Sequence, residues 1–472
     1  MSTQNNNNPW KIMIVIILAL FMIMLDVSVV TVALTEIGKD LGADTSSVSW
    51  VLNAYTLIFA SCLILAGRLG DNFGIKRVFL AGLIIFALSS LACALAPNIA
   101  LLIVMRLVQA FGAALIMPAT LSLVTLAFPA NKRGMAMGIW GTTSGLASAL
   151  GPAIGGVLTQ SFGWRSIFYL NLPISILAVL GALIWIQDSK SLKQKLDIFG
   201  AVLSILMLLF FTLGLTLVAE QGFTSLAQAL FILSIIFFIV FLLREKEMGS
   251  QALLDLALFR EGSFSIGVLV GFFLMFGMMG VFYILPLFWQ TNLNFSPAQA
   301  GIALMPMTLS MLVATPLVGV LTDKISPKII MIIGSVLAVL GCAGLSYFIF
   351  SHIEGLPIML VLLIAGIGMA LLQTPLTATV MASLPASKSG SGSSALTTAR
   401  QLGSLIIVAL ITLTIGQSAS GGQNLIEVPA NSAALSLIYV SVGYLICVAL
   451  LLFMKKEKIE QIVNRKSESD NL

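Results

Sequence analysis

Long apolar runs separated by short polar breaks constrain this chain more than any other feature of its sequence. The first run, from Ile12 to Leu34, holds a single charged residue, Asp26. A helix needs about 20 apolar residues to cross the hydrocarbon core of a bilayer. Only helices or closed barrels satisfy the backbone in lipid, and these runs are too long and continuous for barrel strands. The sequence therefore predicts an all-α integral membrane protein.

The composition excludes several other classes of protein. Of the 472 residues, 59% are hydrophobic and 9% are charged, whereas a soluble domain carries about 25% charged residues. The net charge of +5 does not indicate nucleic-acid binding, because the basic residues lie in short loops. The single histidine and the four cysteines have no metal-ligand spacing, and no nucleophile lies beside a base. We therefore expect no enzyme activity, no metal and no cofactor.

The apolar runs predict 14 membrane spans, and the distribution of Lys and Arg orients them. If the N-terminus is cytoplasmic, 21 of the 24 basic residues fall on the cytoplasmic side, including Arg400 near a span end, two fall outside and Arg106 lies within a span. This bias follows the positive-inside rule and predicts a multi-pass protein of the cell membrane with both termini in the cytoplasm. The predicted spans are 12–34, 48–67, 78–96, 99–127, 135–159, 166–187, 198–218, 226–243, 264–289, 297–321, 329–350, 357–380, 394–416 and 433–454.

A short internal repeat indicates how the spans are grouped. Gly67-Arg-Leu-Gly-Asp71 follows the second span, and Gly319-Val-Leu-Thr-Asp323 follows the tenth. Eight spans between the two copies fit two pseudo-symmetric six-helix bundles with two inserted helices. Internal symmetry of this kind is typical of secondary transporters. The predicted units are an N-terminal bundle at 1–190, an insert at 191–258, a C-terminal bundle at 259–454 and a cytoplasmic tail at 455–472.

The loop after the second span resembles a family signature. Its sequence matches G-x-L-x-D-x-x-G-x-[KR]-[KR], found in the major facilitator superfamily, through Gly67, Asp71, Gly74, Lys76 and Arg77. The resemblance implies the major facilitator fold and a loop that latches the cytoplasmic gate. Glycine allows a tight turn between packed helices, and Asp71 can lie against a helix N-terminus or a basic side chain.

Further motifs are similar to those of the 14-helix drug–proton antiporter branch of this superfamily. The chain has Leu25-Asp-Val-Ser-Val-Val-Thr-Val-Ala-Leu34 in the first span and Arg106-Leu-Val-Gln-Ala-Phe-Gly112 in the fourth. The fifth span resembles the G-P-x-x-G-G antiporter element through Gly151, Pro152, Gly155 and Gly156. Small residues three or four apart let helices approach closely. Close packing without any bearing on transport direction is the alternative interpretation of this element.

Asp26 and Arg106 are the charges that the sequence places deep in the membrane. The first span is expected to end near Glu36 and the fourth to begin near Asn98, so both side chains lie at a similar predicted depth. A charge within a span costs free energy and marks a functional site by default. We predict that Asp26, influenced by Arg106, binds and releases the coupling proton. A buried ion pair that only stabilises the fold is the structural alternative.

These observations predict a transporter, and the resemblance implies a proton-coupled antiporter that exports hydrophobic drugs, chiefly monocations, from the cytoplasm. Two alternatives remain open at this point: a dedicated exporter of a metabolite, lipid or siderophore, and a non-transporting membrane sensor. We expect a monomer whose partners are protons, membrane lipids and a small hydrophobic molecule, with no nucleic acid. The candidate substrate-cavity residues are polar or aromatic positions within spans, namely Asn53, Tyr55, Gln109, Trp140, Tyr283 and Gln373.

Overall fold

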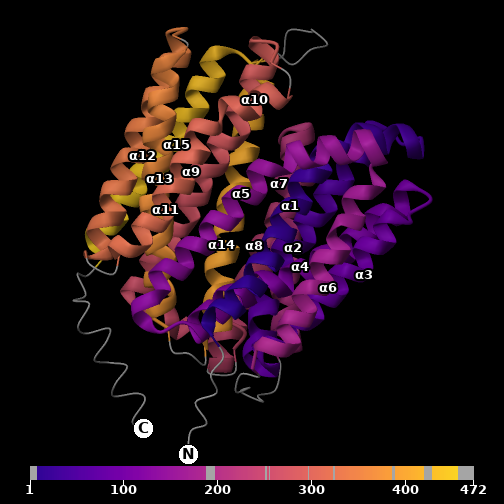
Figure 1. Ribbon diagram of the computed structural model, residues 1–472, viewed down its shortest axis with the longest axis vertical. Coiled ribbons are helices and arrows are strands. Elements are labelled where there is room, and N and C mark those ends of the chain that lie inside the picture. Colours follow the sequence, from indigo (N-terminus) through magenta and orange to yellow (C-terminus); the bar gives the residue numbers. More distant parts are fainter. Residues whose placement is uncertain are drawn as a thin grey trace, which may run out of the picture.

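The chain folds into long helices that run roughly side by side (Figure 1). The computed structural model describes residues 8–187, 197–249, 252–254, 256–295, 297–322, 325–353, 355–384, 388–418 and 428–454. Its elements are α1 (Pro9–Leu41), α2 (Thr45–Phe73), α3 (Ile75–Ala94), α4 (Ile99–Ala127), α5 (Ala130–Phe162), α6 (Arg165–Trp185), α7 (Ile198–Gln221), α8 (Ser225–Met248), η2 (Leu256–Arg260), α9 (Gly262–Asn292), α10 (Pro297–Ala303), α11 (Met305–Thr322), α12 (Pro327–Phe350), α13 (Leu356–Ala382), α14 (Ser389–Ser418) and α15 (Ala430–Phe453).

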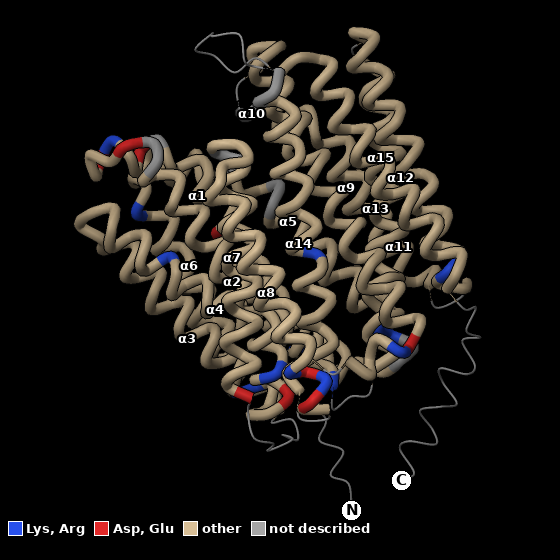
Figure 2. Tube along the Cα trace, turned by 180° about the vertical axis from the view of Figure 1, so that it is seen from behind, with Lys and Arg blue, Asp and Glu red and all other residues tan. Residues whose placement is uncertain are grey.

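The helices are long and apolar enough to cross a membrane. Thirteen helices of the described residues meet that criterion by length and composition. Helix α5 is rich in glycine and alanine and is not among the thirteen, but its 33 residues extend about 50 Å at ~1.5 Å per residue. Charged positions gather toward the two ends of the bundle, and few lie between them (Figure 2). The all-α membrane fold predicted from the apolar runs is confirmed.

Two six-helix halves repeat the same set of helix pairings. In the first half, α1 packs against α5 and α6, α4 packs against α2 and α3, and α3 packs against α6. In the second half, α9 packs against α14 and α15, α13 packs against α11 and α12, and α12 packs against α15. Figure 1 shows these halves as the indigo-to-magenta and the orange-to-yellow groups of helices. The matching pairings are the structural form of the internal repeat.

The two inserted helices lie against both halves. Helices α7 and α8 pack on each other, and α7 also contacts α2 and α14. Apolar side chains of α7, such as Met207 and Leu208, share a cluster with Ile64 of α2 and Leu402 of α14. The predicted boundary at 190/191 lies outside the described residues, and the boundary at 258/259 falls within η2. The residue limits of the predicted units stay predictions, and the tail from 455 is not among the described residues.

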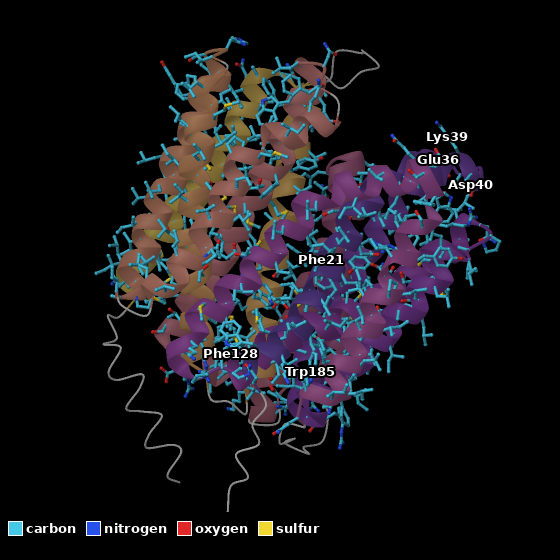
Figure 3. The ribbon with its side chains drawn as sticks, in the orientation of Figure 1. Phe21, Glu36, Lys39, Asp40, Phe128 and Trp185 are labelled. Atoms are coloured by element: carbon cyan, nitrogen blue, oxygen red, sulfur yellow. The ribbon has the colours of Figure 1, made fainter. Side chains whose placement is uncertain are left out.

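The predicted spans 297–321 and 12–34 differ from the observed helices in an instructive way. The span predicted at 297–321 is wrong as a single helix, because it is divided at Leu304 into α10 and α11. Pro306 follows this break by two residues, and proline has no N–H to continue the helical ladder of hydrogen bonds. The first span was expected to end near Glu36, but α1 continues to Leu41, where Gly42 adopts a left-handed φ of 60° and caps it. Figure 3 shows its last turns, with Glu36, Lys39 and Asp40, at the opposite end of the bundle from Phe128 and Trp185.

Candidate functional site

Asp26 and Arg106 form an ion pair inside the N-terminal half. The Arg106 Nη1 atom donates to Asp26 Oδ2 at 2.5 Å, and the two side chains are 0% and 1% exposed. The sequence predicts that Asp26 and Arg106 lie at similar depths below the outer ends of their helices. In fact Asp26 lies 15 residues before the end of α1 and Arg106 seven residues after the start of α4. The two helix ends are therefore at different heights, because α1 extends beyond its apolar run.

Two amide side chains complete the environment of Asp26. Its Oδ1 atom accepts hydrogen bonds from Asn171 Nδ2 at 2.8 Å and from Gln109 Nε2 at 3.1 Å. Gln109 lies three residues after Arg106 on α4 and accepts from Arg106 Nη1 at 2.7 Å through Oε1. Residues three apart share one helix face, so the Arg106 and Gln109 spacing aims both at α1. The carboxylate is thus bonded by α4 and α6 together.

Asn171 is a site residue that the sequence prediction missed. It lies on α6, is 1% exposed, and also donates to Ser90 Oγ of α3 at 3.0 Å. The available signal was a polar amide within an apolar span, six residues after the Trp164-Arg165 pair that begins α6. Its partner could not be read from sequence, since Asp26 is 145 residues away.

Helix α2 holds the other side of the Arg106 guanidinium. Arg106 Nε donates to the backbone carbonyl of Val51 at 3.2 Å. The guanidinium carbon also lies 4.3 Å from the ring centroid of Tyr55, which is 3% exposed. A cation over an aromatic face is electrostatically favourable. Of the candidate cavity residues, Tyr55 and Gln109 therefore belong to the buried ion-pair network.

The glycines of α5 bring that helix against α1 next to Asp26. A Cβ atom on Gly151 would overlap the Ser28 side chain, and one on Gly155 would lie 3.0–3.1 Å from Val29 atoms. Ser28 and Val29 follow Asp26 by two and three residues. Gly156, in contrast, has nothing within 4 Å of an added Cβ. Pro152 lies within α5, but its side chain is outside those that the structure describes.

Asp71 joins the two halves at the end of the bundle where α1 begins and α15 ends, called the terminal end below. Its Oδ1 accepts from the backbone N–H of Gly390, and its Oδ2 accepts from the backbone N–H of Ser391, both at 2.7 Å. The Ser391 hydroxyl donates to the same Oδ2 at 2.6 Å. These groups form the first turn of α14, where the helix dipole and unpaired N–H groups favour an anion. Asp71 of α2 thus caps a helix of the opposite half.

The remaining residues of the loop motif support this contact in different ways. A Cβ on Gly67 would overlap the Gly390 carbonyl oxygen and the Ser394 side chain, so α2 and α14 touch through their backbones. Gly74 has a φ of 96° in the turn between α2 and α3, a region that glycine adopts without strain. Lys76 Nζ donates to the Leu183 carbonyl at 3.2 Å. Arg77 follows it in the first turn of α3.

The contact between α2 and α14 is one seam between the halves. Helix α5 forms a second seam with the C-terminal half. A Cβ on Gly138 would lie 3.1 Å from the Thr315 carbonyl oxygen, and one on Gly141 would lie 3.5 Å from Gln373 Nε2. A Cβ on Gly145, one turn farther along α5, has nothing within 4 Å. The halves therefore meet through α5 at Gly138 and Gly141, and α10 of the C-terminal half also contacts α5. The described hydrogen bonds between the halves join α14 to α2 and α4.

The other cavity candidates have separate surroundings. Trp140 is 3% exposed and donates from Nε1 to Thr120 Oγ1 at 3.0 Å. Tyr283 is 36% exposed, with its hydroxyl 3.3 Å from Thr412 Oγ1. Asn53 is half-buried on α2, and Gln373 is 8% exposed at the second seam. The structure therefore does not gather the six candidates into one cluster.

Arg400 lies farther from the start of its helix than the predicted span placed it. Helix α14 begins at Ser389, five residues before the predicted span, so Arg400 lies 11 residues into it. That distance is about 16 Å at ~1.5 Å per residue. Its side chain is buried, and Nη2 donates to Thr377 Oγ1 of α13 at 2.6 Å. The polar sequence of the first turns of α14 hid this depth, because they pack against the other half and not against lipid.

Comparisons with known proteins identify the family. The family model "Major Facilitator Superfamily" matches residues 16–408. The "Riboflavin transporter RibZ" of Clostridioides difficile (strain 630) is 32% identical, covering 88% of this chain and 90% of the relative. The "Methylenomycin A resistance protein" of Bacillus subtilis (strain 168) is 31% identical, covering 89% and 91%.

A solved structure shows the same fold. A double Trp mutant of XylE superimposes with a TM-score of 0.70 at 16% identity, covering 96% of this chain and 98% of that one. The family match extends over more than half of the chain, in agreement with the two six-helix halves and their seams. The chain therefore belongs to the major facilitator superfamily, a family of membrane transporters.

Proposed function

We propose that this transporter exports hydrophobic compounds, monocations among them, from the cytoplasm in exchange for protons. The observation that carries the proposal is the buried Asp26 carboxylate and its three donors, Arg106, Gln109 and Asn171. A charge at this depth costs free energy and is retained where it serves ion pathways or proton relays. Protonation of Asp26 would remove one half of the ion pair. The network on α1, α4 and α6 would then change its bonding with the proton.

The seams supply the second element of the proposal, a gate. The Asp71 cap on α14 and the glycine contacts of α5 close the terminal end of the bundle. Under the positive-inside orientation, that end faces the cytoplasm. Because Gly151 and Gly155 pack α5 beside Asp26, a helix of the second seam also contacts the proton-binding helix. Rearrangement of α1 on protonation would therefore be transmitted to α5 and to this seam.

Proton movement in inverted membrane vesicles tests the proposal. A panel of lipophilic cations and neutral drugs would be added to vesicles that contain wild type or Asp26→Asn. Wild type should release protons on addition of a substrate, and Asp26→Asn should lose that release. The matched control is Asp40→Asn, which makes the same chemical change at an exposed carboxylate paired with Arg165. Release that survives in Asp26→Asn would contradict the coupling role of Asp26.

A dedicated metabolite exporter is the second candidate function. It is favoured by the similarity to a protein named as a riboflavin transporter, at 32% identity over 419 residues. The vesicle panel should then contain riboflavin beside the drugs. A response to riboflavin alone would support the dedicated exporter, whereas responses to several unrelated compounds would support export of drugs.

A further inference from the structure

Arg400 is a buried cation whose charge has no partner among the described residues. It is 5% exposed, and its Nη2 atom donates to Thr377. The Nε and Nη1 atoms are buried and have no hydrogen-bond partner among the described residues, which also provide no carboxylate within ion-pair distance. A buried charge without a partner is costly. In the other half, by contrast, the negative charge of Asp26 balances the positive charge of Arg106.

The internal repeat shows that the contact with Thr377 does not itself require a charge. Helix α4 contains Pro118-Ala-Thr120, and its counterpart α13 contains Pro375-Leu-Thr377. In the N-terminal half the threonine hydroxyl accepts from Trp140 of α5. In the C-terminal half it accepts from Arg400 of α14, the counterpart of α5. A neutral donor makes the equivalent contact in one half, so the positive charge of Arg400 has a different purpose.

Arg400 lies close to the contact between the two halves. Thr377 is one helical turn from Gln373 on α13, and its hydroxyl donates to the Gln373 carbonyl at 3.0 Å. Gln373 in turn faces Gly141 across the seam, and an added Cβ on Gly145 would meet nothing within 4 Å. Residues four apart share one helix face. The guanidinium is therefore about one turn of α13 from the contact between Gln373 and Gly141.

We propose that Arg400 binds an ionised acidic group, such as a carboxylate, on the transported compound. This inference rests on the proposed function and adds hydrophobic molecules that carry an anionic group to its substrates. The Nε–H and Nη1–H groups provide donors for charge-assisted hydrogen bonds, which are stronger than neutral ones.

Binding of three anthracene probes to the purified protein tests the inference. Anthracene-2-carboxylate is an anion, its methyl ester is neutral, and anthracenylmethyl-trimethylammonium is a monocation, so the three differ mainly in charge. Fluorescence polarisation would give the affinity of each for wild type and variants. The readout is the ratio of carboxylate affinity to ester affinity, because partition into detergent then cancels between variants.

Removal of the charge should abolish the preference for the carboxylate. We expect Arg400→Gln and Arg400→Met to lower the affinity ratio about tenfold or more, the effect of losing a charge-assisted hydrogen bond of roughly 1.5–3 kcal/mol. Arg260→Gln, at an exposed arginine of η2, should leave the ratio unchanged. The methionine variant guards against misfolding, since replacing an unpaired buried cation by an apolar side chain should not lower the thermal unfolding temperature.

Other outcomes separate this inference from the proposed function. A ratio unchanged in both variants, or no carboxylate binding by wild type, would overturn the role of Arg400. A ratio that falls in both variants while no compound causes proton release in vesicles would support Arg400 and overturn the antiport. Tighter binding of the monocation than of the carboxylate, unaffected by Arg400→Met, would favour the cationic substrates expected from the sequence and overturn the inference.

Discussion

Asp71 of α2 accepts two hydrogen bonds from Ser391 of α14, one from the backbone N–H at 2.7 Å and one from the hydroxyl at 2.6 Å. The two residues are 320 positions apart and belong to opposite halves of the molecule. A single carboxylate therefore ties the end of one helix to the start of another across the gate. The contact depends on the negative charge, because an ionised acceptor at a helix N-terminus gains from the helix dipole.

In the Asp71→Asn variant, the two halves should separate more often at the end of the bundle where Asp71 contacts α14. The amide keeps the size of the side chain but removes the charge, and hydrogen bonds to charged groups contribute about 1.5–3 kcal/mol. We expect maleimide to label a cysteine introduced at the buried Ser122 about tenfold faster in Asp71→Asn. The four native cysteines are buried and their labelling would be subtracted. An unchanged rate would show that the glycine contacts alone hold the seam closed.

The Asp26 and Arg106 pair should show strong energetic coupling. Asp26→Asn or Arg106→Gln alone leaves a buried charge without its partner, which costs roughly 3–5 kcal/mol. The double variant removes both charges, so its loss of stability should be well below the sum of the two single losses. Thermal unfolding in detergent measures all four proteins. The exposed Asp40 and Arg165 pair is the control cycle, where water screens the interaction. Additive losses of stability at Asp26 and Arg106 would show that the two charges are not energetically coupled.

The helices could be predicted from the sequence because each span has to hide its backbone from lipid by itself. The ion pair could be anticipated because a charge within an apolar run is conspicuous, as at Asp26 and Arg106. The hydrogen-bond partners that come from distant segments could not be predicted. Asn171 bonds Asp26 from 145 residues away and Ser391 bonds Asp71 from 320, and no local pattern encodes such tertiary contacts.

The distance of Arg400 from the start of its helix was underestimated for a related reason. Hydropathy detects the part of a helix that faces lipid, whereas the first turns of α14 face α2 and α4 and are rich in serine and glycine. Small polar residues suit a close interface between helices but lower the apparent hydropathy. The predicted span therefore began five residues late, and Arg400 was assigned to its edge. The glycine-rich α5 escapes the hydropathy criterion in the same way.

Gly151→Ala should destabilise the contact between α5 and α1. The new Cβ would overlap the Ser28 side chain, and overpacking of this kind typically costs about 1–3 kcal/mol. Gly156→Ala is the matched control, since its added Cβ meets nothing within 4 Å. Thermal unfolding and substrate-driven proton release should both decline in Gly151→Ala and remain near wild type in Gly156→Ala. Ser28→Gly should rescue Gly151→Ala, and failure of the rescue would mean that α5 and α1 are not in contact there.

Asp40 should make the stability of the outer end of α1 dependent on pH. It lies beyond the membrane-spanning part of α1, and hydrogen bonds from Trp164 and then Arg165 lower the pKa of its carboxyl. A carboxyl with a lowered pKa stabilises the fold above its unfolded pKa, about 3.9, and loses that contribution as the pH falls through the folded value. Wild type should therefore unfold at a higher temperature than Asp40→Asn at pH 6, and the difference should shrink as the pH falls below about 4.

Glu36→Gln provides the control for this pH dependence. Glu36 is exposed one turn before Asp40 on α1 (Figure 3), and it forms no ion pair among the described residues. Its replacement should leave the unfolding temperature close to that of wild type across the same pH range. If Asp40→Asn and Glu36→Gln responded alike, the bonds from Trp164 and Arg165 would not stabilise the ionised carboxylate. Only a difference confined to Asp40→Asn, and lost in acid, assigns the effect to the contact between α1 and the start of α6.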